Sequence, residues 1–347
     1  MQHEITKTHA LLDEQGALQE AGYAKAPLLR YDRQAIKAHP LRIKEWDYYL
    51  ITCAEFGLAL TIADNAYMSA DSISLLDFQK PWQHTSTKMG LFSMGKRRLP
   101  SSSEQGDLFA EGKGYFIRFA HKGDHRLLEF HMENFCAGKP ISGTIRLENP
   151  PQDSIVMATP FAGKPTCFYY NQKINCLPAS GQLQFGGREL VFAPNASFGV
   201  LDWGRGVWPY ESTWYWGSAS GLWQGSPLGW NLGYGFGDTS AATENMIFFE
   251  GSAHKLGRIH FSIPMKKQGN SEAEEYLKPW KIHSDDGRFE MDFHPLLDRS
   301  ASTDLWLLKS IQHQVFGYFS GRLLLEDGRE VQVKDFLGFA EKVHSRW

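Results

Sequence analysis

The sequence predicts an all-β protein with antiparallel sheets. Residues 182–185 alternate polar and apolar side chains, as a strand does when only one of its faces is buried. Asp286-Gly287 and Asp327-Gly328 are dipeptides that suit the positive φ angles of tight hairpins. Helical periodicity is almost absent. Strands joined by short hairpins favour meandering barrels or sandwiches, and 347 residues are enough for two of them.

The composition excludes several functional classes. Hydrophobic residues make up 42% of the chain and charged residues 22%, as in folded globular proteins. The net charge is −3 and the basic residues are dispersed, which argues against a nucleic-acid partner. No stretch approaches the ~18 apolar residues of a membrane span, so we expect no stable membrane insertion. The first residues lack a basic region followed by an apolar one, which predicts a cytoplasmic protein.

Motifs for cofactors are missing from the sequence. The four cysteines, Cys53, Cys136, Cys167 and Cys176, form no CxxC and have no histidine at ligand spacing, so we expect no metal site. The glycines of GYGFG (residues 233–237) lie in strand context, and no Walker motif is present, so we expect no nucleotide cofactor. A GxSxG nucleophile elbow is also absent.

The chain divides into three expected segments. Glycine and proline break residues 1–40, which we expect to form an extended arm. Two all-β domains should follow, at residues 41–190 and 191–347. Residues 88–114 have the composition of a long loop, and we expect the basic cluster at residues 96–98 to be a solvated loop tip.

The stretch at residues 198–255 is the strongest candidate for a ligand site. Six of the eleven tryptophans lie between Trp203 and Trp230, among glycines and a few charges. Aromatic walls with embedded charges are typical of ligand sites, and a large aromatic core is the alternative. The candidates for catalysis are Asp202, Arg205, Asp238, Glu244 and His254. The candidates for substrate contact are Trp203, Trp208, Tyr210, Trp214, Trp216, Asn231 and Asn245.

Each catalytic candidate has a functional and a structural interpretation. Asp202 in an aromatic wall would be hard to ionise and could donate a proton, with Arg205 orienting it; alternatively the two form a structural ion pair. Asp238 could act directly or form an Asx turn. His254 could shuttle a proton or cap a turn. Glu244, at the start of a strand, would face a polar cavity or lie exposed at a sheet edge.

The aromatic candidates also allow two interpretations. Trp214 and Trp216 are two residues apart, which places them on one face of a strand. They could form a stacking platform for a sugar or a polyene, or belong to the core.

Several segments together resemble one family across nearly the whole chain. They are residues 11–29, 45–51, 170–181, 202–210 and 231–246, and DWGRGVWPY at 202–210 is the most specific. The chain resembles the family known as domain of unknown function 2804. That family is similar to lipocalin-like carotenoid 1,2-hydratases (hydroxyneurosporene synthases) and tocopherol cyclases. The resemblance implies two lipocalin-like antiparallel barrels packed side by side, and cofactor-free protonation of an alkene. It transfers no catalytic residue.

Residues and resemblance together predict a cofactor-free enzyme of the hydratase, cyclase or isomerase type that acts on a small, largely apolar molecule. Two alternatives stay open. One is a non-catalytic protein that binds a lipophile. The other is a carbohydrate-active enzyme that uses paired carboxylates and a tryptophan platform. The expected partner is therefore a small molecule, lipophilic or sugar-like, and the sequence makes no prediction of oligomeric state.

Overall fold

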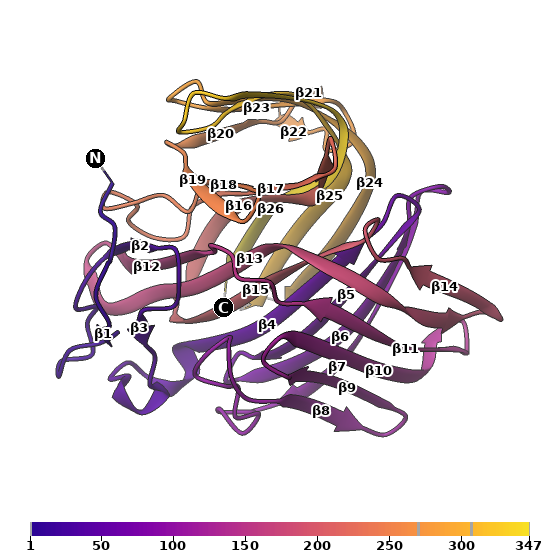
Figure 1. Cartoon of the computed structure of the whole chain (residues 1–347). Helices are drawn as coiled ribbons and strands as arrows, with labels where there is room; N and C mark the ends of the chain where they lie inside the picture. The colour runs from indigo at the N-terminus through magenta and orange to yellow at the C-terminus, as the bar shows by residue number, and fades with distance from the viewer. Residues whose placement is uncertain (1, 269–270, 306–307, 347) are drawn as a thin grey trace.

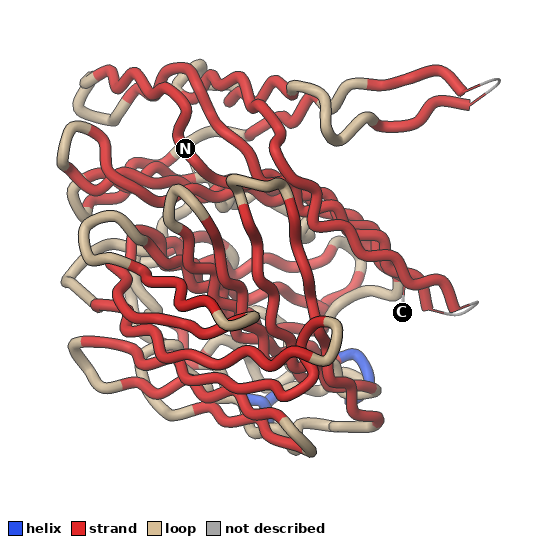
Figure 2. The backbone as a smooth tube through the Cα atoms, turned by 90° about the vertical axis from the view of Figure 1, so that its right-hand side faces the viewer, coloured by secondary structure: helices blue, strands red, loops and turns tan. Residues whose placement is uncertain are grey.

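The computed structural model describes residues 2–268, 271–305 and 308–346, and strands dominate it (Figures 1 and 2). Two curled antiparallel sheets pack against each other, and the second sheet lies above the first in Figure 1. The described residues contain two short 3-10 helices, η1 (Arg33–Ala35) and η2 (Pro40–Arg42), and no α-helix. The predicted fold class is therefore confirmed.

The first sheet has thirteen strands. Its main path runs β7-β6-β5-β4-β15-β13-β11-β10-β9-β8, with β12, β14 and β2 attached beside it. The strands are β2 (Gly22–Ala24), β4 (Ile43–Thr52), β5 (Phe56–Asp64), β6 (Met68–Asp77), β7 (Trp82–Leu91), β8 (Leu108–Gly112), β9 (Tyr115–His121), β10 (His125–Cys136), β11 (Lys139–Glu148), β12 (Ile155–Phe161), β13 (Lys164–Phe185), β14 (Arg188–Phe192) and β15 (Phe198–Val207).

The second sheet has nine strands in the order β19-β18-β17-β16-β26-β25-β24-β23-β20. They are β16 (Glu211–Trp223), β17 (Ser226–Tyr234), β18 (Met246–Phe249), β19 (Ser252–Lys255), β20 (Ile259–Ser262), β23 (Trp280–Ser284), β24 (Phe289–Leu305), β25 (Leu308–Leu324) and β26 (Glu330–Arg346). Two small pairs complete the fold, parallel β1 (His9–Ala10) with β3 (Leu29–Arg30) and antiparallel β21 (Met265–Gln268) with β22 (Ser271–Glu274).

The chain passes from the first sheet to the second between β15 and β16. β15 lies between β4 and β13 in the middle of the first sheet, whereas β16 pairs with β17 and β26. The expected domain limit after residue 190 differs from this sheet boundary, because β15 belongs with the first sheet. The predicted hairpins form: Gly287 and Gly328 have φ of +67° and +85° in the β23–β24 and β25–β26 turns.

Strand alternation creates two opposite environments in the first sheet. Tyr49 and Ile51 of β4 belong to the core inside that sheet. Tyr48 and Leu50, on the other face, join a second apolar layer together with Trp216 of the second sheet. This layer between the sheets is what positions the candidate site. A third core fills the second sheet.

The N-terminal segment packs against both sheets. Ile5, Leu11 and Tyr31 are buried in the first core, and β2 pairs with β12. The backbone N–H of His3 donates to the carbonyl of Ala241, 2.8 Å away, near the second sheet.

The long loop between β7 and β8 folds back into the first sheet. The Arg97 guanidinium forms an ion pair with the fully buried carboxylate of Asp71, and Leu99 is buried. The expected solvated loop tip is therefore wrong for Arg97, because a buried carboxylate requires a cationic partner. Lys96 and Arg98 are exposed.

Candidate functional site

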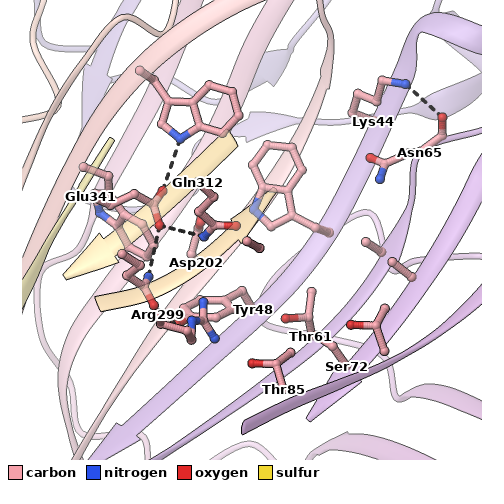
Figure 3. A pocket seen from close by; sticks show the side chains of 18 of the residues that line it. Lys44, Tyr48, Thr61, Asn65, Ser72, Thr85, Asp202, Arg299, Gln312 and Glu341 are labelled. Atoms are coloured by element: carbon pink, nitrogen blue, oxygen red, sulfur yellow. Dashed lines mark hydrogen bonds between the residues drawn. The ribbon is translucent and has the colours of Figure 1, made fainter. Parts of the chain in front are cut away.

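A cleft of about 650 Å³ lies between the two sheets and extends the apolar layer that joins them (Figure 3). One side comes from β4, β5, β6, β7, β13 and β15 of the first sheet, and the other from β16, β24, β25 and β26. Its volume falls in the usual range for small-molecule sites.

Aromatic rings form one part of the cleft wall. They are Trp46, Tyr48, Tyr169, Trp208, Trp214, Trp216 and Phe236. Trp208 and Trp214 meet edge to face with centroids 5.2 Å apart, and Tyr48 meets Trp216 across the sheets at 5.9 Å. Gly204 makes this arrangement possible, since a Cβ there would overlap the Trp46 ring.

Hydroxyl groups of the first sheet form another part of the wall. Thr61, Ser72 and Thr87 are paired across β5, β6 and β7, so their side chains form a row. Beside them Ser74 Oγ and Thr85 Oγ1 are hydrogen-bonded at 2.8 Å. Figure 3 shows Thr61, Ser72 and Thr85 gathered on one side of the cavity, away from Glu341 and Gln312. The cleft therefore suits a molecule with an apolar body and a polar side.

Asp202 and Lys173 form an ion pair in the wall. The Lys173 ammonium lies 3.1 Å from Asp202 Oδ1 and 4.1 Å from the Trp216 ring centroid. The Asn171 amide donates to the same oxygen at 2.6 Å. Both neighbours stabilise negative charge on the carboxylate. Asp202 Oδ2 has no hydrogen-bond partner within the described ranges, and Asp202 lines the cleft.

Glu341 of β26 is the second carboxyl group in the wall. Its Oε1 accepts the indole N–H of Trp214 at 3.2 Å, and its Oε2 accepts the side-chain amides of Gln312 and Gln314, each at 3.1 Å. Burial raises the pKa of Glu341, and the charge of Arg299 opposes that rise. A larger fraction of this carboxyl group is therefore protonated near neutrality than of an exposed glutamate.

Two further cations line the cleft. Arg299 of β24 donates from Nη1 to Ser74 Oγ at 3.0 Å, a bond that crosses between the sheets. Lys44 of β4 donates to the Asn65 carbonyl at 2.9 Å, and burial lowers its pKa to about 7. In Figure 3 Lys44 and Asn65 lie apart from the Glu341 end of the cavity.

Four of the residues named from the sequence line the cleft: Asp202, Trp208, Trp214 and Trp216. Trp214 and Trp216 lie on one face of β16, as their spacing predicted. Both rings line the cleft and also pack in the apolar layer between the sheets.

Arg205 does not contact Asp202, so the expectation that it orients that carboxylate, or pairs with it, is wrong. The two side chains lie three residues apart on a strand and therefore point to opposite faces. Arg205 is buried inside the first sheet, where it pairs with Asp47 at 2.9 Å and its Cζ lies 4.1 Å from the Trp203 ring centroid. Trp203 is likewise in that core.

Glu244, Asn231 and Asn245 lie behind the aromatic wall. Asn231 Oδ1 accepts the indole N–H of Trp216 at 2.8 Å, which holds the orientation of that ring. Glu244 accepts from Asn231 Nδ2 at 3.4 Å, and burial raises its pKa to about 7. Asn245 Oδ1 accepts the Gly233 backbone N–H at 2.6 Å. These residues support the wall without lining the cleft.

Asp238, His254 and Tyr210 lie outside the cleft, so the residues named from the sequence do not form one site. Asp238 Oδ1 accepts the Ser240 backbone N–H at 3.0 Å, as in an Asx turn. His254 Nδ1 accepts the Glu326 backbone N–H at 3.3 Å. Tyr210 is exposed, and the Arg42 guanidinium carbon lies 5.5 Å from its ring centroid.

Glu341, Arg299 and Lys173 were missed because they lie outside the tryptophan-rich stretch. The sequence did contain an indication of Glu341. Phe339, Glu341 and Val343 are spaced two residues apart and therefore share one face of a strand. A carboxyl group between two apolar side chains on such a face is unusual unless it has buried partners or faces a polar cavity.

Within residues 2–268, 271–305 and 308–346 no group of three or more His, Cys, Asp or Glu side chains could hold a metal ion. The same described ranges contain no helix of the length and apolarity needed to cross a membrane.

Comparison with known proteins places the sequence in a family. The pattern that defines the family described as "Domain of unknown function (DUF2804)" matches residues 2–347. The chain belongs to this family. The resemblance seen in the sequence is thereby confirmed. No curated protein matches the chain.

Solved structures resemble the chain at low sequence identity. One is a putative AttH from Nitrosomonas europaea, with a TM-score of 0.55, 14% identity, and coverage of 93% of this chain and 98% of that one. Another is kievitone hydratase from Nectria haematococca, with a TM-score of 0.47, 11% identity, and coverage of 98% of each chain. At 14% identity the first match shows the fold alone, and the second, with a TM-score below 0.5, supports no argument.

Proposed function

We propose that the cleft is the active site of a cofactor-free acid–base enzyme of the hydratase, cyclase or isomerase type. Its substrate is a small molecule with an apolar, unsaturated body and a polar side. The observation that carries the proposal is the place of Glu341, a buried carboxyl group with a raised pKa in the wall of a substrate-sized cleft.

Glu341 acts as the proton donor. A carboxyl group whose pKa is moved toward neutrality keeps its proton at the working pH and can still release it in the reaction. When Glu341 carries its proton, a half-turn of the Gln312 amide presents an oxygen that accepts the new O–H group. The carbocation formed by protonation of an alkene would lie against Trp46, since an aromatic ring face stabilises positive charge and the rings of Trp216 and Tyr48 already contact the Lys173 and Arg299 cations.

Asp202 acts as the base. Lys173 and Asn171 occupy its Oδ1, which leaves Oδ2 to accept a proton. In a hydration, Glu341 protonates one alkene carbon, the oxygen of a water molecule bonds to the other, and Asp202 takes a proton from that water. In an isomerisation or cyclisation, Asp202 takes the proton from carbon instead. Two carboxyl groups in different environments are the usual basis for such a division of roles.

The test begins with the molecule that co-purifies with the protein, identified by mass spectrometry after solvent extraction. It is incubated with the wild type, Glu341→Gln or Glu290→Gln in D₂O. Glu290, an exposed carboxylate on β24 paired with Arg322, is the control for loss of one charge. We expect water addition or deuterium incorporation by the wild type and Glu290→Gln, and a rate at least ~10²-fold lower in Glu341→Gln, the usual size of a general-acid contribution.

The mass change also decides between the alternatives. Cleavage of the molecule at a glycosidic bond would indicate a carbohydrate-active enzyme. Glu341 and Asp202 would then be the paired carboxyl groups of glycoside hydrolysis. A molecule that binds but returns unchanged from all three proteins would contradict catalysis and leave a binding protein.

A further inference from the structure

We infer that Arg299 forms an anion subsite in the cleft and that the ligand carries a carboxylate group on its polar side. This inference rests on the proposed function of the cleft, and it specifies in addition that the ligand is negatively charged. It comes from the hydrogen bonding of one guanidinium, from its neighbours, and from the ion pairs that other cations in or near the first sheet form.

Arg299 has donors to spare. A guanidinium offers five N–H groups in a planar fork. Its contacts among the described residues are one hydrogen bond to Ser74 Oγ at 3.0 Å and the Tyr48 ring, whose centroid is 5.8 Å from Cζ. No carboxylate of the described residues lies at ion-pair distance from it. The charge of Arg299 acts on Glu341, which lies beyond ion-pair distance and has a raised pKa.

Three other cations in or near the first sheet are each paired with a carboxylate. Arg205 is paired with Asp47, Arg97 with Asp71, and the cleft ammonium of Lys173 with Asp202. Arg299 is half-buried and lines the cleft, so an anion from the cleft can reach the N–H groups that Ser74 does not use.

The surroundings of Arg299 suit a small planar anion. Ser74 and Thr85 are hydrogen-bonded to each other beside it, and the hydroxyl row of Thr61, Ser72 and Thr87 continues along the same wall. Hydroxyl groups donate to anion oxygens without adding charge. A single guanidinium matches one carboxylate, which it can bind through two parallel hydrogen bonds. The same ligand's apolar body would then extend toward Trp216 and Glu341.

This arrangement has a chemical consequence for the proposed reaction. A substrate carboxylate on Arg299 removes the positive charge that lowers the pKa of Glu341. Ligand binding would therefore favour the protonated form of Glu341, which is the form that donates a proton.

The test uses two probes that differ in charge and hardly in shape, 2-naphthoate and 2-naphthamide. Their binding to the wild type, Arg299→Gln, Arg299→Lys and Arg322→Gln is measured by calorimetry and by quenching of tryptophan fluorescence. Arg322 is the control because it is a partly exposed arginine of β25 that does not line the cleft and is paired with Glu290. We expect 2-naphthoate to bind the wild type more tightly than 2-naphthamide by about 10- to 100-fold, the usual gain from a charge-assisted hydrogen bond.

Arg299→Gln should remove this preference and leave 2-naphthamide binding unchanged. Arg299→Lys should retain part of it, since an ammonium keeps the charge but cannot form the bidentate pair. Arg322→Gln should behave as wild type. Equal binding of the two probes to the wild type would overturn the anion subsite and leave the apolar cleft as a binding site. A structural role of Arg299 would instead weaken both probes equally in Arg299→Gln. Failure of both probes to bind the wild type would overturn the subsite and the proposed use of the cleft together.

Discussion

Removing the charge of Asp202 should destabilise the protein because it leaves the Lys173 ammonium buried without its partner. Lys173 is 1% exposed and lies 3.1 Å from Asp202 Oδ1. Asp202→Asn keeps the shape of the side chain and removes the negative charge. We expect a loss of about 3–5 kcal/mol in the free energy of unfolding, the usual cost of breaking a buried pair from one side.

The reverse change should cost less. Lys173→Met leaves an Asp202 carboxylate that still accepts from Asn171 at 2.6 Å and reaches the cleft. We expect a loss of about 1–3 kcal/mol, as for a polar group without its partner. The double variant replaces the pair by neutral side chains of similar volume, so it should be more stable than Asp202→Asn alone.

Urea unfolding followed by tryptophan fluorescence measures these differences. An unpaired buried ammonium gives up its proton more readily than a lysine of the unfolded chain, so the unfolded chain of Asp202→Asn binds more protons. The stability of this variant should therefore rise with pH relative to wild type. Losses that simply add in the double variant, or a deficit that does not change with pH, would refute the reasoning.

Two further predictions concern residues around the cleft. Burial raises the pKa of Glu244 to about 7, above the ~4.3 of a glutamate in an unfolded chain. Between these two pH values the folded state therefore binds more protons than the unfolded state. The stability of the wild type should fall as the pH rises through that range. Glu244→Gln cannot titrate and should flatten this part of the urea-unfolding profile, whereas an unchanged slope would assign it to another group. Gly204→Ala places a methyl group against the Trp46 ring and should cost about 1–3 kcal/mol by overpacking, with weaker 2-naphthamide binding. Adding Trp46→Phe should recover both losses, and a double variant as poor as Gly204→Ala would show that the crowding lies elsewhere.

The sequence was a good guide to local structure. Aspartate-glycine dipeptides marked two hairpins that form, and period-two spacing placed Trp214 and Trp216 on one face. The same period could have separated Asp202 from Arg205, since residues three apart on a strand point to opposite faces. Gly204 lies inside β15, so the alternation runs unbroken from Asp202 to Arg205.

The full composition of the site was beyond the sequence. Tyr48, Arg299 and Glu341 come from strands far apart in the chain, and their meeting depends on how the two sheets pack. Glycine 204 illustrates the difficulty: its role is to make room for Trp46, a ring on a strand brought alongside only by long-range pairing. Alternation within one strand carries no information about which strand lies beside it.

The central place of β15 in the first sheet has a consequence for the synthesis of the chain. Ile43 pairs with Val207 and Thr52 with Phe198. β4 therefore cannot complete its pairing until β15 has left the ribosome, which happens much later in synthesis. Until then the strands from β4 to β7 and those from β8 to β13 form two separate pieces, each with an unpaired edge. Contacts of such long sequence separation slow folding, and unpaired edges invite association between chains. We therefore expect a nascent chain stopped before residue 198 to need a chaperone, and one extended past Val207 to complete the first sheet before the second is made.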